Sequence, residues 1–165
     1  MVRLEPGETG PLAPAVNESL EELAPWMPWA QSPATFGSIG DFLEETRARW
    51  ADLSGFGYVL RHPRTGSIIG ACALHARLGP GALEIGHWGA PRSQRAGVAT
   101  AAAAALTDAA LALSGVTRTE IHCDESNNRS AAVPARLGCT LVGITDRQPD
   151  TPASTGRFMT WVLRR

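Results

Sequence analysis

Apolar residues recur along this chain with two different periods, which predict two kinds of element. A period near 3.6 covers 11–23 and resumes over 37–55, and both segments are expected to be helices. Pro11 and Pro14 are tolerated only in a first helical turn, which places the start of the first helix there. The stretch APWMPWAQSP at 24–33 carries three prolines and separates the two helices.

The second of these helices carries signals at both ends. Asp41 is a competent N-cap, and Gly55 has the conformational freedom to end the helix. Phe42, Trp50 and Leu53 are predicted to form its apolar stripe.

A period of two, typical of strands, dominates the remaining segments. Strands are predicted at 2–5, 56–62, 67–78, 82–89, 117–123, 140–147 and 157–165. The turn PRTG joins the second strand to the third, and GPG leads into the fourth. A short helix, NNRSAAVPARLG, ends on Gly138. With an alanine-rich helix after Gly97, the order β-α-α-β-β-β-α-β-α-β-β predicts an α/β (α+β) fold, a mixed sheet with helices on its faces.

Composition and charge narrow the function classes. The 165 residues suffice for one domain, which we expect to span 1–165. A net charge of −1 provides no basic field, so neither nucleic acid nor a membrane surface is expected as a partner. Three cysteines without CxxC spacing favour a reducing compartment, and no metal is expected. The chain has no apolar run of about 20 residues and no signal-peptide core, which predicts a cytoplasmic protein.

The segment PRSQRAGVATAAAAALTDAALALSG, at 91–115, carries the clearest chemistry. Gly97 lies where a loop becomes a helix, and the first N–H groups of a helix have no partner within it, so an anion is favoured there. Arg95 or Arg92 would add a donor fork suited to phosphate. The chain has no lysine and hence no Walker-type loop, and only Gly97 of a dinucleotide GxGxxG is present. The plainer alternative is an alanine-rich core helix behind an exposed arginine loop.

The pattern around this segment resembles the GNAT superfamily of N-acetyltransferases. QRAGVA, from Gln94 to Ala99, fits the acetyl-coenzyme A motif of that family: Gln or Arg, any two residues, Gly, any residue, then Gly or Ala. EIGHWGAP resembles the strand that precedes the motif. DESNNRSAAVPARLGC and APWMPWA resemble segments of the branch that includes RimJ-like and RimL-like enzymes. Together these segments cover nearly the whole chain in order.

The resemblance implies a GNAT fold: a mixed, mostly antiparallel seven-stranded sheet flanked by about four helices, with one splayed pair of parallel strands. Acetyl-coenzyme A would lie in that gap, with its pantetheine amides on the backbone of Trp88 and Gly89. The pyrophosphate would fall on the helix start, which comprises Arg95, Ala96, Gly97, Val98, Ala99 and Thr100. Asn127, a good helix cap, would also contact the cofactor.

Transfer would be direct, from acetyl-coenzyme A to an amine, with Cys123 not needed as a nucleophile. Pro134 stands where many family members have a tyrosine acid, so Ser130 is the candidate that assists the leaving thiolate. Glu84 is the preferred base. His87 lies on the opposite face of the same strand by parity, so we expect at most one of the two to point into the cleft. His75, Asp124 and Asp146 remain alternative bases.

The acceptor is predicted to be a protein N-terminal α-amine. At pH 7 an α-amine is neutral in about one molecule in seven, whereas a lysine amine is neutral in about one in 2,500, so a site without a strong base favours the former. Trp26 and Trp29 are candidate substrate-wall residues. A small-molecule amine acetyltransferase and a non-catalytic acyl-coenzyme A-binding module are the alternatives, and a homodimer is left open.

Overall fold

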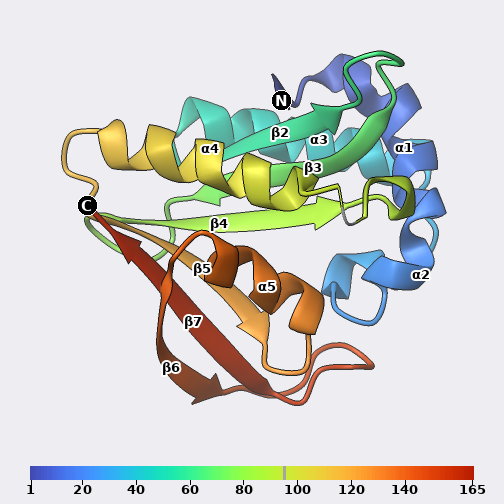
Figure 1. The fold of residues 1–165 in the computed structure, drawn as a ribbon. Coiled ribbons are helices and arrows are strands. Elements are labelled where there is room, and N and C mark those ends of the chain that lie inside the picture. The colour runs from blue at the N-terminus through green and yellow to red at the C-terminus, as the bar shows by residue number, and fades with distance from the viewer. Residues whose placement is uncertain (95) are drawn as a thin grey trace.

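A computed structural model describes residues 1–94 and 96–165, which form a seven-stranded mixed sheet in the order β1-β2-β3-β4-β5-β7-β6 (Figure 1). The strands are β1 (Val2–Arg3), β2 (Gly55–Arg61), β3 (Ile68–His75), β4 (Ala82–Gly89), β5 (Arg118–Asp124), β6 (Thr140–Asp146) and β7 (Arg157–Arg164). Every neighbouring pair is antiparallel except β4 and β5, which run parallel. The predicted seven-stranded mixed sheet is therefore confirmed.

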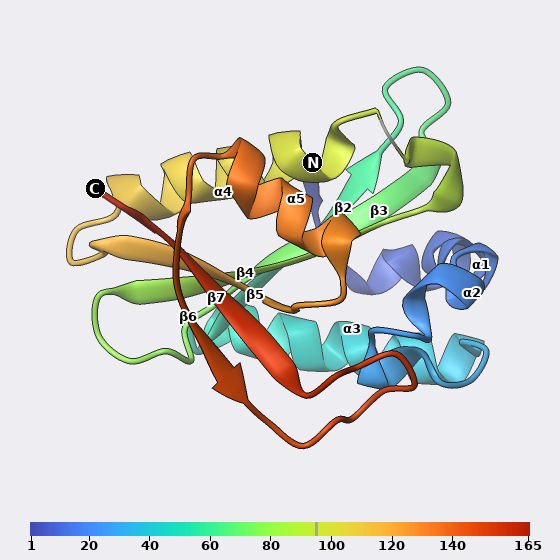
Figure 2. The same cartoon turned by 60° about the horizontal axis from the view of Figure 1, so that its bottom comes forward.

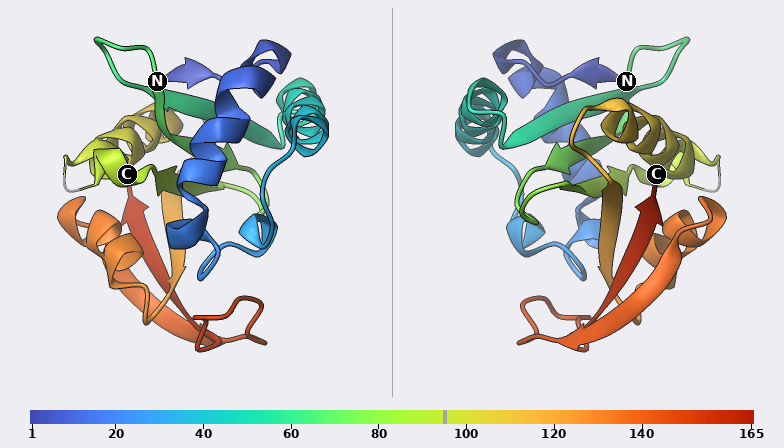
Figure 3. Two further views of the ribbon diagram at one scale, coloured as in Figure 1. Left: turned by 90° about the vertical axis from the view of Figure 1, so that its right-hand side faces the viewer. Right: turned by 90° about the vertical axis from the view of Figure 1, so that its left-hand side faces the viewer.

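Helices cover both faces of the sheet (Figure 3). They are α1 (Thr9–Glu18), α2 (Leu20–Leu23), α3 (Phe36–Ala51), α4 (Val98–Ala112) and α5 (Asn128–Arg136). The helices α1 and α3 lie on one face, while α4 and α5 lie on the other. The four longer helices correspond to the four that the sequence predicts, but the first predicted helix, 11–23, is divided at Ser19 into α1 and α2. No helix among the described residues has both the length and the apolarity to cross a bilayer.

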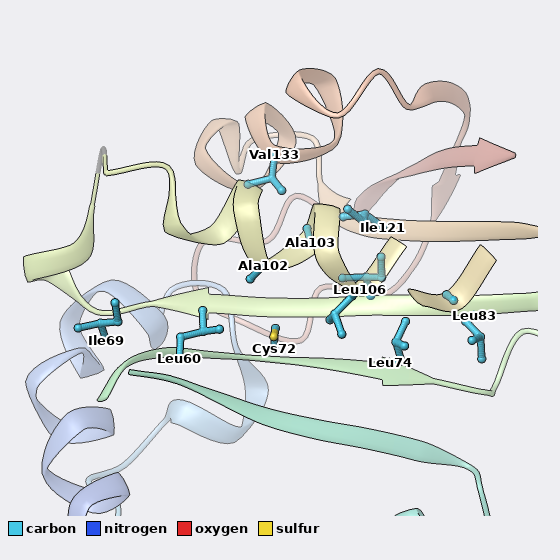
Figure 4. Close-up of a cluster of buried hydrophobic side chains, with 12 residues drawn as sticks. Leu60, Ile69, Cys72, Leu74, Leu83, Ala102, Ala103, Leu106, Ile121 and Val133 are labelled. Carbon is cyan, nitrogen blue, oxygen red and sulfur yellow. The ribbon is translucent and has the colours of Figure 1, made fainter. Parts of the chain in front are cut away.

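The larger core lies between α4 and the sheet (Figure 4). Ala102, Ala103 and Ala110 are buried there, together with Leu106. Because alanine side chains are so short, α4 packs close to β3 and β4 and its N-terminus is held against the sheet. The position of that N-terminus matters for the candidate site.

The first helix begins earlier than predicted. It starts at Thr9, not Pro11, after a 3₁₀ turn at Pro6–Glu8, and Pro14 therefore lies inside the helix. A proline there removes one N–H donor, and the chain accepts this because Leu12 and Val16 are buried against the sheet. Tertiary burial outweighs the local penalty.

The expected limits of the second long helix were also wrong. Its N-cap is Thr35, whose hydroxyl accepts from the Ser38 N–H while the Ser38 hydroxyl accepts from the Thr35 N–H; Asp41 lies inside the helix. The helix ends at Ala51 and Gly55 already belongs to β2. Between them, Leu53 takes the left-handed conformation with a φ of 62°.

The apolar stripe predicted for this helix was wrong in part. The residues that face the core are Ile39, Leu43 and Thr46, spaced by four and three positions. Trp50 lies four positions after Thr46 and so continues this stripe, where it contacts the rings of Phe56 and Tyr58 edge-on. Phe42 and Leu53 are exposed.

Candidate functional site

The parallel strands β4 and β5 separate part of the way along their length. They are paired at Ala82–Arg118, Leu83–Thr119 and Glu84–Glu120, and no later pair is formed among the described residues. Figure 1 and Figure 2 show the two strands diverging from that point. The half of β4 that runs to Gly89 is therefore paired with β3 alone, and its other edge offers backbone groups to a ligand. The splayed parallel pair expected from the family resemblance is present.

A cavity of about 900 Å³ opens at this divergence. Its walls come from α3, from the loop that carries Trp26 and Trp29, from β3 to β5, from the start of α5, and from the β6–β7 connection. The lining includes Gly86 and His122 from one face of the sheet, and Ile85 and Cys123 from the other. The cavity therefore passes through the gap between the strands and connects the two faces.

The start of α4 forms one end of the candidate site. Gly97 is its N-cap residue with a φ of 72°, and no side chain caps the helix. A Cβ added at Gly97 would meet nothing within 4 Å, so the space in front of the first N–H groups is open. Of the first four residues of α4, only Ala101 has a backbone acceptor for its N–H among the described residues, and that acceptor is the Gly97 carbonyl. An anion fits this arrangement.

The two arginines considered for the phosphate have different outcomes. Arg92 forms an ion pair with Glu18 and donates to the Ile68 carbonyl, so its guanidinium ties the loop to α1 and β3. One donor on each terminal nitrogen of Arg92 is therefore engaged within the protein, and its alternative role as a phosphate contact stays a prediction. Arg95 lies outside the described residues, and its predicted role stays a prediction.

The other predicted cofactor residues lie along this same edge. Trp88 and Gly89 end β4, opposite Ala71 and Gly70 of β3, and Trp88 lines the cavity. Val98 and Thr100 belong to the first turn of α4, with Ala96 just before it and Ala99 within it. All of these positions stay predictions as cofactor contacts.

Asn127 and Ser130 lie at the opposite wall of the gap, where α5 begins. The Asn127 side chain accepts from the Ser130 N–H at 3.0 Å, so Asn127 is the N-cap of α5. Both residues line the cavity beside Cys123. Burial raises the pKa of the Cys123 thiol although a hydrogen bond from Ser130 opposes the shift, so the thiol stays protonated. The proposed contact of Ser130 with a leaving thiolate remains untested.

Glu84 lies at the last β4–β5 pair and lines the cavity on its α3 face. Arg77 Nε and Nη2 donate to its two carboxylate oxygens at 2.6 and 2.7 Å. Burial alone would raise the pKa of Glu84, but the hydrogen bonds and charge of Arg77 outweigh it and lower that pKa. The carboxylate is therefore ionised, and both of its oxygens have a donor.

The expectation that only one of Glu84 and His87 reaches the cleft was wrong, since both line the cavity. Alternation does place them on opposite faces, but the cavity runs through the sheet and meets both faces. Burial lowers the pKa of His87 to about 4, and its Nδ1 atom is buried without a hydrogen-bond partner. This imidazole is neutral at physiological pH.

Asp124 has a structural role. Its carboxylate accepts from the Ser126 and Ser154 hydroxyls and from the Thr155 and Gly156 N–H groups, which pins the β6–β7 connection over the cavity. Burial would raise the pKa of Asp124, but these hydrogen bonds hold it well below its usual range. Asp146 is exposed on β6, so neither aspartate is placed to take a proton from a substrate.

The predicted substrate-wall residues Trp26 and Trp29 both line the cavity, and Trp29 is 54% exposed. The Ala153 N–H donates to the Pro25 carbonyl at 3.1 Å, which links this tryptophan loop to the β6–β7 connection. The two loops therefore form one wall of the entrance on the α3 side.

Sequence reasoning missed three residues on that side: Arg118, Glu120 and His122 of β5. His122 lines the cavity, and its Nε2 lies 2.9 Å from Glu120 Oε2. Arg118 Nε donates to the other Glu120 oxygen at 2.7 Å. Strict alternation in RTEIHCD already places these three side chains on one strand face, so parity was the available signal.

Comparison with known proteins agrees with this geometry. A sequence model described as an acetyltransferase (GNAT) domain matches residues 3–140. YdaF of Bacillus subtilis (strain 168), named as a proposed ribosomal N-acetyltransferase, is 30% identical over 138 residues, covering 82% of this chain and 74% of that protein.

Two solved structures share the fold. The microcin C7 self-immunity acetyltransferase MccE, solved with acetyl-CoA and AMP, has a TM-score of 0.90 at 16% identity, covering 99% of this chain and 90% of that one. RimL, the ribosomal L7/L12 α-N-protein acetyltransferase solved with coenzyme A, has a TM-score of 0.89 at 17% identity, covering 99% and 92%.

Proposed function

Because this chain belongs to the GNAT family of N-acetyltransferases, we propose that it transfers the acetyl group of acetyl-coenzyme A directly to the α-amine at the N-terminus of a protein. The observation that carries the proposal is the cavity that passes through the β4–β5 gap, with the open start of α4 near one side and a polar, aromatic-walled entrance on the other. Such a passage brings two substrates to one point from opposite faces of the sheet.

The cofactor half of the proposal assigns the pyrophosphate to the α4 start. Gly97 leaves room for it, and the N–H groups of residues 97–100, with the Arg95 side chain, would donate to its oxygens, whereas the Ala96 N–H already donates to the Ser93 carbonyl. The unpaired edge of β4 at Trp88 and Gly89 would pair with the pantetheine amides as an added strand does. Asn127 would contact the same arm from α5.

In the transfer step, the neutral amine attacks the thioester carbonyl, a C–N bond forms and the C–S bond breaks. Backbone N–H groups on the open edge of β4 would stabilise the charge that develops on the carbonyl oxygen. Ser130 would donate a hydrogen bond to the departing thiolate sulfur. Glu84 would hold a water near the amine, with Arg77 fixing the carboxylate. The buried thiol of Cys123 takes no covalent part.

The preference for an α-amine rests on protonation and on the relatives. A lysine amine would need a strong base to be deprotonated, whereas an α-amine is neutral in about one molecule in seven at pH 7. The glutamates at the cavity are paired with arginines. The names of YdaF and RimL refer to ribosomal acceptors, which supports a protein N-terminus as the acceptor class here.

A panel of acceptors tests the proposal. Thiol release from acetyl-coenzyme A is followed with an alanine-initiated peptide, the same peptide already acetylated at its N-terminus, a lysine peptide with a blocked N-terminus, and ethanolamine. We expect turnover with the first peptide and not with its blocked form, and mass spectrometry should place the acetyl group on the α-amine.

Other results on the panel would point elsewhere. Turnover with ethanolamine alone would replace the protein acceptor by a small-molecule amine. Tight binding of acetyl-coenzyme A without turnover of any amine would indicate a cofactor-binding module and refute an enzyme of this kind.

A further inference from the structure

A group of ionisable side chains lines or adjoins the cavity on the α3 face of the sheet. They come from three adjacent strands and the segment after β3, and they are His75, Arg77, Glu84, Arg118, Glu120 and His122. Although four of them are histidine or glutamate, no set of three or more within the described residues is placed to hold a metal ion. The arrangement instead suits a proton transfer.

His122 lies next to the gap. It comes two residues after Glu120, the last residue of β5 that is paired with β4, and Gly86 comes two residues after the partner Glu84. Glycine has no side chain, so β4 places none there; the His75 ring lies beside this position, with its Nε2 3.5 Å from where a Cβ would stand, and both Gly86 and His122 line the cavity. The His122 imidazole is thus within the acceptor half of the passage, beside the opening.

Glu120 orients this imidazole. An ionised carboxylate accepts hydrogen bonds only, so Nε2 of His122, at 2.9 Å from Oε2, carries the hydrogen and Nδ1 carries the lone pair. The second oxygen of Glu120 accepts from Arg118, and the Glu120 and His122 side chains are 11% and 13% exposed. Nδ1 has no hydrogen-bond partner among the described residues, and His122 lines the cavity.

The carboxylates nearby are less suited to accept a proton. Arg77 donates to both oxygens of Glu84, and the pKa of that carboxyl is lowered as a result, against the effect of burial. Asp124 accepts from several hydroxyl and N–H donors of the β6–β7 connection. In each case the existing donors stabilise the ionised carboxylate, so protonation would weaken those hydrogen bonds.

The other two histidines at the cavity also differ from His122. Burial and the charge of Arg77 lower the pKa of His75, and no described carboxylate is hydrogen-bonded to its ring. His87 is on the opposite face of β4, where burial lowers its pKa to about 4. His122 alone among these three histidines has a described carboxylate that is hydrogen-bonded to its ring and fixes the orientation of the ring.

We propose that His122 is the catalytic base, which takes a proton from the acceptor amine through Nδ1, and that Glu120 is the residue that positions it. The inference rests on the proposed function. The amine nitrogen uses its lone pair to form the C–N bond, the pair of the broken C–S bond leaves on sulfur, and one amine proton passes to His122. The proton returns to solvent before the next turnover.

Charged groups surround His122 from every packed element, and the pH dependence of the reaction includes their effect. They are Glu45 and Arg49 of α3, His75 of β3, Arg77 just after β3, Glu84 of β4, Arg118, Glu120 and Asp124 of β5, and Arg147 and Asp150 of the β6–β7 connection. Several of these are already engaged in the ion pairs Glu45–Arg49, Arg77–Glu84 and Arg118–Glu120, so the site holds few unpaired charges.

The test compares four variants of the full chain: His122→Gln, Glu120→Gln, His75→Gln and Glu84→Gln. The acceptor is the alanine-initiated peptide, or ethanolamine if the peptide is not acetylated, and kcat is measured from about pH 5.5 to 9, the range in which histidines titrate. Acetyl-coenzyme A titrations check that each variant retains the cofactor site. If His122→Gln binds no cofactor, His122→Asn takes its place.

We expect His122→Gln to lose about 10²-fold in kcat at neutral pH, at the lower end of what general bases contribute, with unchanged acetyl-coenzyme A affinity. The fall of wild-type kcat toward acid pH should become shallower in that variant, which leaves only the part that comes from protonation of the acceptor amine itself. Glu120→Gln should lose about tenfold and keep the acid fall, since His122 is still present but less well oriented. His75→Gln, the comparison histidine from the same cavity, should keep the acid fall of the wild type.

The assignment is overturned if His122→Gln keeps the rate and the acid fall of the wild type, or if Glu84→Gln is the variant in which the acid fall becomes shallower. An active wild type with either result leaves the acetyltransferase proposal intact. A wild type that binds acetyl-coenzyme A and acetylates neither acceptor would refute the proposed function and this base together.

Discussion

Substituting Gly97 by valine is the sharpest perturbation of the proposed anion site. Gly97 holds the N-cap position of α4 with a φ of 72°, and an added Cβ would meet no atom within 4 Å. A valine side chain therefore projects into the space where we place the pyrophosphate, and its Cβ comes within 4 Å of none of the described atoms outside its neighbours in the chain. The two consequences, on folding and on binding, can be calculated separately.

The folding cost comes from the backbone. A residue with a Cβ in the left-handed region costs roughly 1–3 kcal/mol, and a β-branched residue lies at the upper end of that range. The binding cost comes from lost hydrogen bonds. Displacing the anion from two N–H groups forfeits about 1.5–3 kcal/mol for each bond to a charged acceptor. A sum of about 3–6 kcal/mol weakens acetyl-coenzyme A binding by roughly 10²–10⁴-fold.

Gly115→Val is the matched control. Gly115 follows the opposite end of the same helix, has a φ of 85°, and also has open space around its would-be Cβ. Thermal melting should show a similar loss of stability in both variants, while titration calorimetry should show weak acetyl-coenzyme A binding for Gly97→Val only. Equal acetyl-coenzyme A affinity in the two variants would refute the anion site at α4, because the backbone strain that both variants share would then explain any loss of affinity.

Two further outcomes are expected. Asp124→Asn should lower the free energy of unfolding by about 2–3 kcal/mol in urea titrations at pH 7. The folded-state pKa of Asp124 is lowered, so the stabilisation by its carboxylate is present above about pH 4 and is lost as the pH falls through the folded-state pKa. The difference in free energy of unfolding between wild type and Asp124→Asn should therefore shrink in acid. A difference that stays constant with pH would contradict this. Ser130→Ala should reduce kcat by about 10²-fold with unchanged acetyl-coenzyme A affinity, whereas Asn127→Ala should weaken that affinity; an unchanged kcat would remove Ser130 from the reaction.

The strands and their order were predictable from the sequence because the signals are local. The alternation of apolar residues predicted strands at 82–89 and 117–123, each within one residue of the observed strand, because successive side chains of a strand point to opposite faces of the sheet. Asn127 and Gly138 similarly marked the ends of α5, because capping depends on residues a few positions apart.

Local signals failed where several candidates competed. Thr35 and Asp41 can both cap a helix, and what favours Thr35 is the burial of Ile39 and Leu43 against the sheet, a tertiary effect. Pro14 inside α1 has the same explanation. In both helices, contact with a distant strand outweighs a preference that the sequence expresses over a few residues.

The candidate site divides in the same way. The family motif around Gly97 and the alanine-rich helix behind it predict the cofactor end from contiguous residues alone. The acceptor end depends on neighbours far apart in the chain: Glu84 lies opposite Glu120 across the last parallel pair. Asp124 binds Thr155, which is 31 positions away. Parity put His122 on the same face as Glu120, but the register of β4 against β5 decided that the strands part just beyond Glu120 and leave His122 beside the gap. That register depends on the packing of α4 and α5 against the sheet, which acts across the whole fold and has no short-range signature in the sequence.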